Sequence, residues 1–330
     1  MNTYSGVRVG VVGATGYSGT ELVRLLRRHP GVVLETTMGS AGAEPRRLPA
    51  LKGIWDAPVV PLDLDRLAGL DAVFLAVPDT LSAEIGPGLA ARGPRVFDLS
   101  GAFRLRDGAL RTRWYPHSPE PGLPVTYGLT ERYRSALPDA RLVACAGCYP
   151  TAAILPLQPL VAAGLLEEGI VIDAKSGVSG AGKTPTERTH FSEIHGSMAA
   201  YGVFAHRHGA EIEQEVGAAV TFVPHLVPLD RGILETIYVR LRAGATAADV
   251  ERVLGDAYGD APFVRLTGSD LPEIKHVAHT NFCDIGWRVA PDGRQVVIVA
   301  CIDNLVKGAA GQAIQNFNVA FGFPEAMGLN

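Results

Sequence analysis

Residues 7–19 read Val-Arg-Val-Gly-Val-Val-Gly-Ala-Thr-Gly-Tyr-Ser-Gly, an apolar run that leads into three glycines at Gly13, Gly16 and Gly19. Residues 21–28 then carry apolar side chains at helical spacing, so the pattern predicts a strand, a glycine turn and a helix. In a dinucleotide-binding unit such a turn lets the backbone approach a pyrophosphate, whose charge the helix N-terminus stabilises. The alternative is a glycine-rich turn that binds nothing. We expect cofactor contacts from the loop residues Gly13, Thr15, Gly16, Tyr17, Ser18 and Gly19.

The chain beyond this loop alternates strands with helices. Apolar runs predict strands at residues 32–38, 70–78 and 95–100, and a helix at residues 82–91. This alternation predicts the α/β class, with a parallel, doubly wound Rossmann sheet whose ligands lie beyond the carboxyl ends of its strands. Pro78 and Ser100 fall at such ends, and we expect Pro78 to contact the cofactor.

The end of the strand at residues 32–38 bears on the choice of cofactor. Enzymes that prefer NAD usually place an acidic residue there to hold the ribose 2′-hydroxyl. Here the strand ends at Gly39-Ser40, Glu35 lies too far back, and Arg46-Arg47 follow in the loop. A hydroxyl group and arginines suit a 2′-phosphate, so Ser40 and Arg46 favour NADP(H). The alternative is that both arginines are merely solvated.

The second half of the chain is rich in strands. Strands are predicted at residues 169–176, 219–226, 232–241, 281–289 and 295–302, with a helix at residues 247–258. Long strands with few crossover helices predict a mostly antiparallel sheet in an α+β domain, a surface suited to dimerisation. Residues 303–316 are predicted to open a long amphipathic helix.

Composition limits the classes of function. The 330 residues are 47% hydrophobic and 19% charged, with a formal net charge of −4, which is ordinary for a globular protein and argues against nucleic acid as a partner. The start of the chain has no basic leader, and the first apolar run has only the length of a strand, so we expect no signal peptide and no membrane span. Four cysteines make no disulfide framework, so we expect a cytoplasmic protein.

Cys148 is the first candidate for chemistry. An apolar run ends at Ala144, Gly147 permits a sharp turn, and Pro150 suits the first turn of a following helix. Cys148 is therefore predicted at a helix N-terminus, where the helix dipole favours the thiolate and makes a nucleophile. The alternative is a small buried cysteine.

Residues 205–212, Ala-His-Arg-His-Gly-Ala-Glu-Ile, are the second candidate. If Gly209 opens a helix, His208 and Glu211 share one face, and the carboxylate can orient the imidazole. His206 is interpreted as structural. Two histidines two residues apart could also bind a metal, but no third ligand cluster of familiar spacing is present, and we expect no metal.

Residues 177–184, Gly-Val-Ser-Gly-Ala-Gly-Lys-Thr, match the pattern of a P-loop after a predicted strand. A P-loop needs a helix that starts at its Lys-Thr, whereas Pro185 follows at once here. ATP binding by a nucleotide kinase is therefore an alternative rather than the expected function.

Several segments together resemble the N-acetyl-γ-glutamyl-phosphate reductase family, and the resemblance covers nearly the whole chain. Residues 143–151 are similar to the family's active-site signature, although Cys145 and Ala146 replace its usual Asn-Pro. The other similar segments are Asp-Leu-Ser-Gly-Ala-Phe-Arg at 98–104, Tyr-Gly-Leu-Thr-Glu at 127–131, Ser-Gly-Val-Ser-Gly-Ala-Gly at 176–182, His-Arg-His-x-x-Glu at 206–211, and Arg-Gly-Ile at 231–233.

The resemblance implies reductive dephosphorylation of N-acetyl-γ-glutamyl phosphate by NADPH, a step of arginine biosynthesis. In this reading Cys148 is the nucleophile that forms a thioester and His208 is the acid/base, with Glu211 beside it. The acyl-phosphate substrate is expected to meet Ser100, Arg104, Ser179, Gly180, Gly182, Lys183 and Arg231.

The resemblance also implies a domain organisation. Residues 1–147 are expected to form the NADP-binding Rossmann domain, and residues 148–304 the catalytic and dimerisation domain. The helix within residues 305–330 is expected to return to the first domain and face the nicotinamide through Gly308 and Gln312. We expect a homo-oligomer, a dimer or a tetramer.

Three rival enzyme readings remain. A lysine-pathway relative would act on an aminoadipyl phosphate that is linked to a carrier protein, and aspartate-semialdehyde dehydrogenase shares the chemistry. A P-loop kinase would instead bind ATP. A redox module built on Cys145-x-x-Cys148 is a further alternative of a different class.

Overall fold

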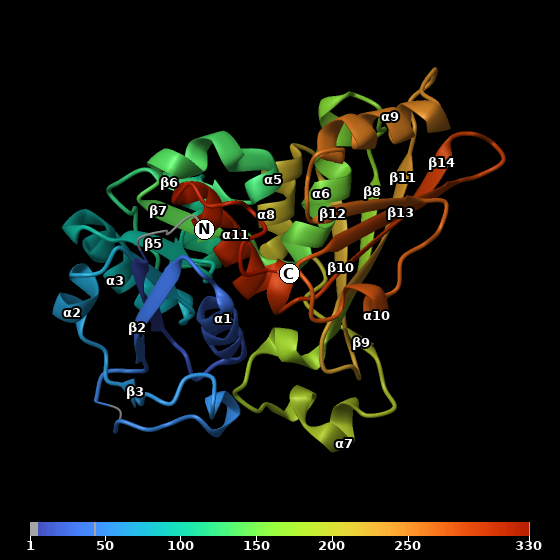
Figure 1. Ribbon diagram of the computed structural model, residues 1–330. Helices are drawn as coiled ribbons and strands as arrows, with labels where there is room; N and C mark the ends of the chain where they lie inside the picture. The colour runs from blue at the N-terminus through green and yellow to red at the C-terminus, as the bar shows by residue number, and fades with distance from the viewer. Residues whose placement is uncertain (1–5, 43, 330) are drawn as a thin grey trace. The chain divides into compact units, whose positions relative to one another are not determined.

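The computed structural model describes residues 6–42 and 44–329 and divides into two compact units (Figure 1). Unit 1 comprises Met1–Gly147 and Ala309–Asn330, and unit 2 comprises Cys148–Gly308. The expectation of no leader sequence concerns residues 1–5, which lie outside the described residues. No helix among the residues described is long and apolar enough to cross a membrane.

Unit 1 is built on a seven-stranded sheet in the order β3-β2-β1-β4-β5-β7-β6, with every neighbouring pair parallel. The central strand β4 is buried at every position, as expected when helices cover both faces of a parallel sheet. The predicted doubly wound α/β sheet is therefore confirmed. Its strands are β1 (Val7–Val12), β2 (Val32–Met38), β3 (Val59–Val60), β4 (Ala72–Leu75), β5 (Arg95–Asp98), β6 (Val125–Gly128) and β7 (Leu142–Cys145).

Two helices of unit 1 begin directly after an aspartate that caps them. Asp63 and Asp107 cap α2 and α4 through side-chain oxygens that accept a backbone N–H, which explains where these two helices start. The helices are α1 (Tyr17–Arg28), α2 (Leu64–Ala68), α3 (Asp79–Arg92), α4 (Gly108–Trp114), α5 (Thr130–Tyr133) and α11 (Gly311–Ala320), with 3₁₀ turns η1 (Pro49–Leu51) and η2 (Arg134–Asp139).

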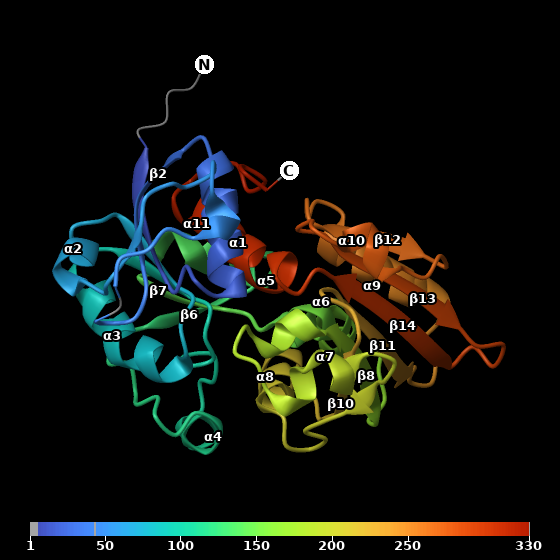
Figure 2. The same cartoon turned by 90° about the horizontal axis from the view of Figure 1, so that it is seen from below.

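Helix α11 comes from the end of the chain and packs within unit 1, beside α1, α5 and β7 (Figures 1 and 2). The ring of Phe317 lies 5.7 Å from that of Phe74 and 5.8 Å from that of Phe97, between centroids. The prediction of an amphipathic helix was wrong, because α11 is buried on nearly all sides. Two of its side-chain amides donate inside the unit: Asn316 Nδ2 donates to Gly128 O at 2.9 Å, and Gln312 Nε2 donates to Thr130 Oγ1 at 2.8 Å.

Unit 2 is built on a second seven-stranded sheet, in the order β12-β13-β14-β11-β8-β10-β9. The pairs β8–β10 and β12–β13 are parallel and the other neighbouring pairs are antiparallel, so the predicted mostly antiparallel sheet is confirmed. The short edge strands β9 and β12 were not predicted. The strands are β8 (Ile170–Gly177), β9 (Ala199–Ala200), β10 (Val220–Val227), β11 (Ile233–Arg240), β12 (Val264–Gly268), β13 (Cys283–Val289) and β14 (Gln295–Ile302).

Helix α6 packs along β11 and β14, and helices α8 and α9 flank it. The helices of unit 2 are α6 (Cys148–Ala162), α7 (Phe191–Ile194), α8 (Arg207–Val216), α9 (Ala247–Tyr258) and α10 (Ile274–Val277), with 3₁₀ turns η3 (Val178–Ala181) and η4 (Glu187–Thr189). A π-helical segment, η5 (Val306–Ala310), leads out of the unit.

The central sheet of unit 2 contains a buried acidic side chain, Glu235 of β11. It is fully buried between Ala174 of β8 and Ala300 of β14, and neither carboxylate oxygen has a hydrogen-bond partner among the described residues. Burial raises the pKa of Glu235 well above its ordinary value, although the charge of Lys175 acts in the opposite direction.

Candidate active site

The glycine loop between β1 and α1 divides its glycines between two tasks. Gly13 has φ +87°, and a Cβ there would lie 2.1 Å from Ala76 O, while a Cβ on Gly19 would lie 2.1 Å from Gly13 O. A Cβ on Gly16 would meet only Gly13 O at 3.6 Å. Gly13 and Gly19 are therefore required for the turn and for helix packing, whereas the backbone of Gly16 stays open for a ligand to approach.

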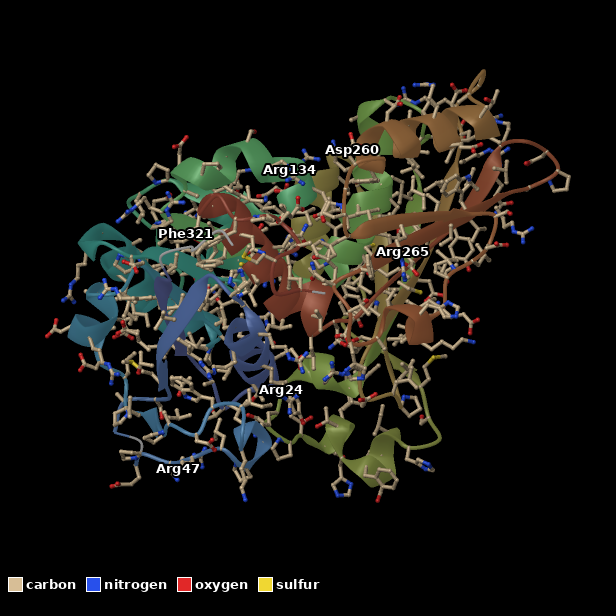
Figure 3. The ribbon with its side chains drawn as sticks, viewed as in Figure 1. Arg24, Arg47, Arg134, Asp260, Arg265 and Phe321 are labelled. Carbon is tan, nitrogen blue, oxygen red and sulfur yellow. The ribbon has the colours of Figure 1, made fainter. Side chains whose placement is uncertain are left out.

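The end of β2 carries the residues expected at a 2′-phosphate. Ser40, Arg46 and Arg47 all have exposed side chains, and the backbone of Arg46 is fixed by two hydrogen bonds with Val59. Figure 3 shows Arg47 at the margin of unit 1, with its side chain directed outward. The guanidinium groups are thus accessible on a loop with a defined backbone. Pro78 is also exposed and immediately precedes α3, at the carboxyl end of β4.

Ser100 and Arg104 lie deeper than a simple anion site would require. Ser100 Oγ donates to Asp98 Oδ2 at 2.8 Å, and burial raises the pKa of Asp98. Arg104 is buried, and its guanidinium donates to Cys145 O and to Leu99 O, each at 2.8 Å. These bonds tie the ends of β5 and β7 together. Their polar atoms thus stabilise this sheet edge, and contact of either residue with the substrate stays a prediction.

Cys148 is the first residue of α6 and is partly exposed, as predicted from Gly147 and Pro150. The π-helical segment η5 passes directly against it: a Cβ on Gly308 would lie 2.7 Å from Cys148 Cβ. Gly308 is itself buried and packs beside the cysteine, and its contact with the cofactor stays a prediction. Gln312 is likewise fully buried, and its Nε2 donates to Thr130 Oγ1; its contact with the cofactor stays a prediction.

Cys145 is unlike Cys148, since it is fully buried at the end of β7. Burial raises the pKa of its thiol to about 12, and Asn316 Nδ2 lies 3.7 Å from its Sγ. A thiol that stays protonated at neutral pH is a poor attacking group for disulfide exchange. This environment disfavours the redox module built on Cys145 and Cys148.

The two histidines of residues 206 and 208 lie at the start of α8. The helix begins at Arg207, two residues earlier than the expected opening at Gly209. His206 caps it, since its Nδ1 accepts a hydrogen bond from His208 N at 3.1 Å. His208 is partly buried, and Glu211 is buried one helical turn further along. The helix therefore brings His208 and Glu211 close to one face, as predicted from their spacing.

The segment at residues 177–184 does not adopt P-loop geometry. After the short turn η3, Gly182 has φ +87°, and the next helical segment among the described residues begins only at Glu187. Two amides of the expected phosphate cradle are already used, because Ser179 N donates to Asp230 O and Gly182 N to Ser179 O. Gly180 and Lys183 are exposed.

Arg231 lies beside this segment within unit 2. Its guanidinium contacts Asp303 Oδ2 at 3.2 Å, and Asp303 is fully buried. The same carboxylate oxygen accepts from His279 N at 2.6 Å, and the other one accepts from Leu305 N at 2.8 Å. Asp303 therefore fixes the orientation of Arg231 and connects it to the segment that leads into η5. Among the described residues no group of three or more His, Cys, Asp or Glu side chains is arranged to hold a metal ion.

Comparison with known proteins identifies the family. Residues 8–140 match the family model "Semialdehyde dehydrogenase, NAD binding domain", and residues 148–304 match "Semialdehyde dehydrogenase, dimerisation domain". The first match confirms the predicted nicotinamide dinucleotide cofactor. Proteins named N-acetyl-gamma-glutamyl-phosphate reductase from Brevibacillus brevis and Desulforudis audaxviator are 44% and 46% identical, and each alignment covers 98% of both chains.

Solved structures of aspartate semialdehyde dehydrogenases share the fold. Aspartate semialdehyde dehydrogenase II from Vibrio cholerae has a TM-score of 0.72 at 17% identity, with 96% of this chain and 98% of that chain covered. The enzyme from Candida albicans, solved with NADP, has a TM-score of 0.70 at 16% identity over 96% and 98% of the two chains. The family named from the sequence motifs is thus confirmed at high identity over nearly the full length, and the chain belongs to the N-acetyl-γ-glutamyl-phosphate reductases, oxidoreductases with the semialdehyde dehydrogenase fold.

Proposed function

We propose that this chain reduces N-acetyl-γ-glutamyl phosphate to N-acetylglutamate semialdehyde with NADPH, in arginine biosynthesis. The observation that carries the proposal is Cys148, a partly exposed cysteine that forms no disulfide, at the first residue of α6, in a chain 44% and 46% identical to reductases of that name. The positive end of the helix dipole favours its thiolate.

The chemistry follows from these side chains. The Cys148 thiolate attacks the acyl carbon, the bond from that carbon to the phosphate oxygen breaks, and inorganic phosphate leaves with the electron pair. The resulting thioester accepts a hydride far better than a carboxylate does, and bound NADPH supplies that hydride. His208 supplies the proton as the thiohemiacetal collapses to the aldehyde and Cys148 is released. Buried Glu211 orients His208 from the next helical turn.

The proposed cofactor site is the glycine loop with Thr15, Tyr17 and Ser18, together with Pro78. Its support is the open backbone at Gly16, where no side chain obstructs a pyrophosphate. The choice of NADP(H) over NAD(H) rests on Ser40 and on the exposed arginines Arg46 and Arg47, which suit the 2′-phosphate. No acidic residue directly follows β2, where enzymes that prefer NAD hold the ribose 2′-hydroxyl.

The proposed substrate site uses Arg231 for a carboxylate of the substrate and the exposed turn at Gly180 and Lys183 for the phosphate. The support for Arg231 is that a buried partner, Asp303, fixes its guanidinium without covering it completely: the side chain is 14% exposed. Ser179 directly precedes Gly180 in this turn, and its side chain is held there because its Oγ accepts a hydrogen bond from Asn304 Nδ2 at 3.0 Å. We assign the phosphate to backbone N–H groups of this turn other than those of Ser179 and Gly182, which already donate to backbone carbonyls.

A trapping experiment tests the proposal. Incubation with the acyl phosphate in the absence of NADPH should add the mass of one N-acetylglutamyl group to Cys148 and release one equivalent of phosphate, and NADPH should then discharge the adduct as semialdehyde. Cys145→Ser is the matched control and should still form the adduct, whereas Cys148→Ser should not. Absence of an adduct on the unmodified protein would reject the thioester mechanism.

Turnover of other substrates and calorimetry with ATP distinguish the alternative functions. Turnover of a carrier-linked aminoadipyl phosphate or of aspartyl phosphate, without turnover of N-acetyl-γ-glutamyl phosphate, would replace the proposed substrate. Saturable ATP binding by calorimetry would restore the kinase alternative, for which the turn after β8 lacks the helix that a P-loop needs.

We further propose a cytoplasmic homo-oligomer, a dimer or a tetramer. One face of the unit 2 sheet is covered by α6, while residues such as Leu234 and Tyr238 on the opposite face are partly exposed. Residues 148–304 also match a family model described as a dimerisation domain. Sedimentation equilibrium at micromolar concentration tests this proposal, and a monomer would reject it.

A further inference from the structure

His206 lies at the centre of a cluster of rings in unit 2, which we call the His206 cluster. The cluster is formed by Tyr149, Tyr201, His206, His208 and Phe222. The ring of His206 contacts all four others edge to face, at centroid distances of 4.8 Å to His208, 5.4 Å to Tyr201, 5.6 Å to Phe222 and 5.9 Å to Tyr149. Edge-to-face contact is one of the favoured geometries of ring pairs, so these contacts restrict the orientation of the His206 ring.

Two members of the cluster belong to or adjoin the proposed catalytic groups: His208 is the proposed acid/base, and Tyr149 is the neighbour of the proposed nucleophile. Tyr149 directly follows Cys148 in α6, and His208 is in α8, a helix that packs against α6. Tyr149 is anchored on its other side, where its hydroxyl donates to His225 O of β10 at 3.1 Å and lies 3.3 Å from the hydroxyl of Tyr201. The rings of Tyr149 and His208 also contact each other edge to face, at a centroid distance of 5.9 Å, and the ring of His206 packs against both.

His206 also holds the backbone of His208 directly. Its Nδ1 accepts the hydrogen bond from His208 N, so Nδ1 is unprotonated and a neutral ring carries its proton on Nε2. Burial, together with the charge of Arg207, lowers the pKa of His206 to about 4. At neutral pH this ring remains an acceptor and places no second positive charge beside His208.

We propose that His206 is a positioning residue, whose capping bond and ring contacts together fix the imidazole of His208 relative to Cys148. This inference rests on the proposed role of His208 as the acid/base. It assigns His206 no contact with substrate or cofactor. Its two contributions, a hydrogen-bond acceptor and an aromatic ring, can be removed separately.

Two variants divide these contributions. His206→Asn keeps a short side-chain acceptor that is among the best helix caps but removes the ring. His206→Phe keeps a ring but removes the acceptor. We expect each to lower kcat by about 10–100-fold, the effect of misplacing a catalytic group by around 1 Å, with KM for the acyl phosphate and Kd for NADPH within about twofold of the unmodified enzyme.

The matched control is His190, a second histidine that caps a helix through its ring. His190 Nδ1 accepts from Ser192 N at 3.3 Å at the start of α7, and His190 is not part of the His206 cluster. His190→Asn should leave kcat unchanged. A loss in this control equal to the loss in His206→Asn would show that capping in general, rather than the cluster, sets the rate, and would overturn the proposal.

A double-mutant cycle with His208→Asn separates the inference from the proposed function. If His206 acts through His208, His206→Phe should lower kcat no further once His208 has been replaced. Wild-type kcat in His208→Asn would reject the proposed acid/base itself. A strong loss in His208→Asn with wild-type kcat in both His206 variants would overturn the positioning role alone, even if those variants melt at lower temperature.

Discussion

The glycine loop offers a stringent test, because two substitutions three residues apart should affect different properties. One should lower stability, and the other should lower the affinity for NADPH. Gly13→Ala places a Cβ 2.1 Å from Ala76 O at a backbone φ of +87°. The left-handed conformation costs about 1–3 kcal/mol for a residue other than glycine, and relief of the overlap costs about 1–3 kcal/mol more. We therefore expect Gly13→Ala to lower the free energy of unfolding by about 2–6 kcal/mol.

Gly16→Ala is the matched counterpart. Its φ is −77°, and the nearest atom to the new Cβ is Gly13 O at 3.6 Å, an ordinary contact distance. Its melting temperature without cofactor should stay within a few degrees of the unmodified value, while the added methyl group blocks the approach of the pyrophosphate and raises Kd for NADPH by at least about tenfold.

Urea unfolding of the cofactor-free proteins and fluorescence titration with NADPH measure the two effects separately. Equal losses of stability in both variants would refute the division of tasks between the glycines. NADPH binding by Gly16→Ala at the unmodified affinity would refute the proposed site of the pyrophosphate.

Three further predictions address the other parts of the molecule. Cys148→Ser should abolish turnover while NADPH still binds, since a serine hydroxyl stays protonated at neutral pH, and steady-state rates above a small fraction of the unmodified rate would contradict the nucleophile. Replacement of both Arg46 and Arg47 by alanine should lower the preference for NADPH over NADH, measured as the ratio of kcat/KM values, by about tenfold or more. Equal use of both cofactors by the unmodified enzyme would contradict the 2′-phosphate site. Glu235→Gln should stabilise the protein at pH 8 but not near pH 4. Because the native pKa of Glu235 is raised, its carboxyl group ionises in the unfolded chain above the ordinary pKa of 4.5 while it stays protonated in the native state, and this difference destabilises the native state as the pH rises. A difference in melting temperature that does not grow between pH 4 and pH 8 would contradict that pKa shift.

Local signals in the sequence were sufficient for the elements that depend on near neighbours. The start of α6 at Cys148 follows from Gly147 and Pro150, and the placement of His208 and Glu211 one helical turn apart in α8 follows from their spacing. The parallel sheet followed from alternation of apolar strands and helices. These features are set within a few residues, where propensity and periodicity act.

The features that were missed depend on residues far away in the sequence. The amides of α11 look like a polar face until Gly128 and Thr130 supply their partners, which lie more than 180 residues earlier. The position of Gly308 against Cys148 and the rings around His206 are likewise long-range contacts without a local pattern. The hydrogen bonds from the Arg104 guanidinium to two backbone carbonyls are also contacts that the local motif did not indicate.

The return of α11 to unit 1 also has a consequence for the order in which the chain acquires its structure during synthesis. Unit 2 is continuous in sequence, so it has all its strands once residue 308 has been made. Unit 1 begins first but lacks the helix that covers Phe74 and Phe97 until the last residues are added. At the usual elongation rate of roughly 5–20 residues per second, the apolar surface that receives Phe317 waits on the order of ten to thirty seconds for it. A ribosome that stalls within unit 2 therefore holds an unfinished nucleotide-binding sheet, and that nascent chain is the species in which we expect chaperone binding to concentrate.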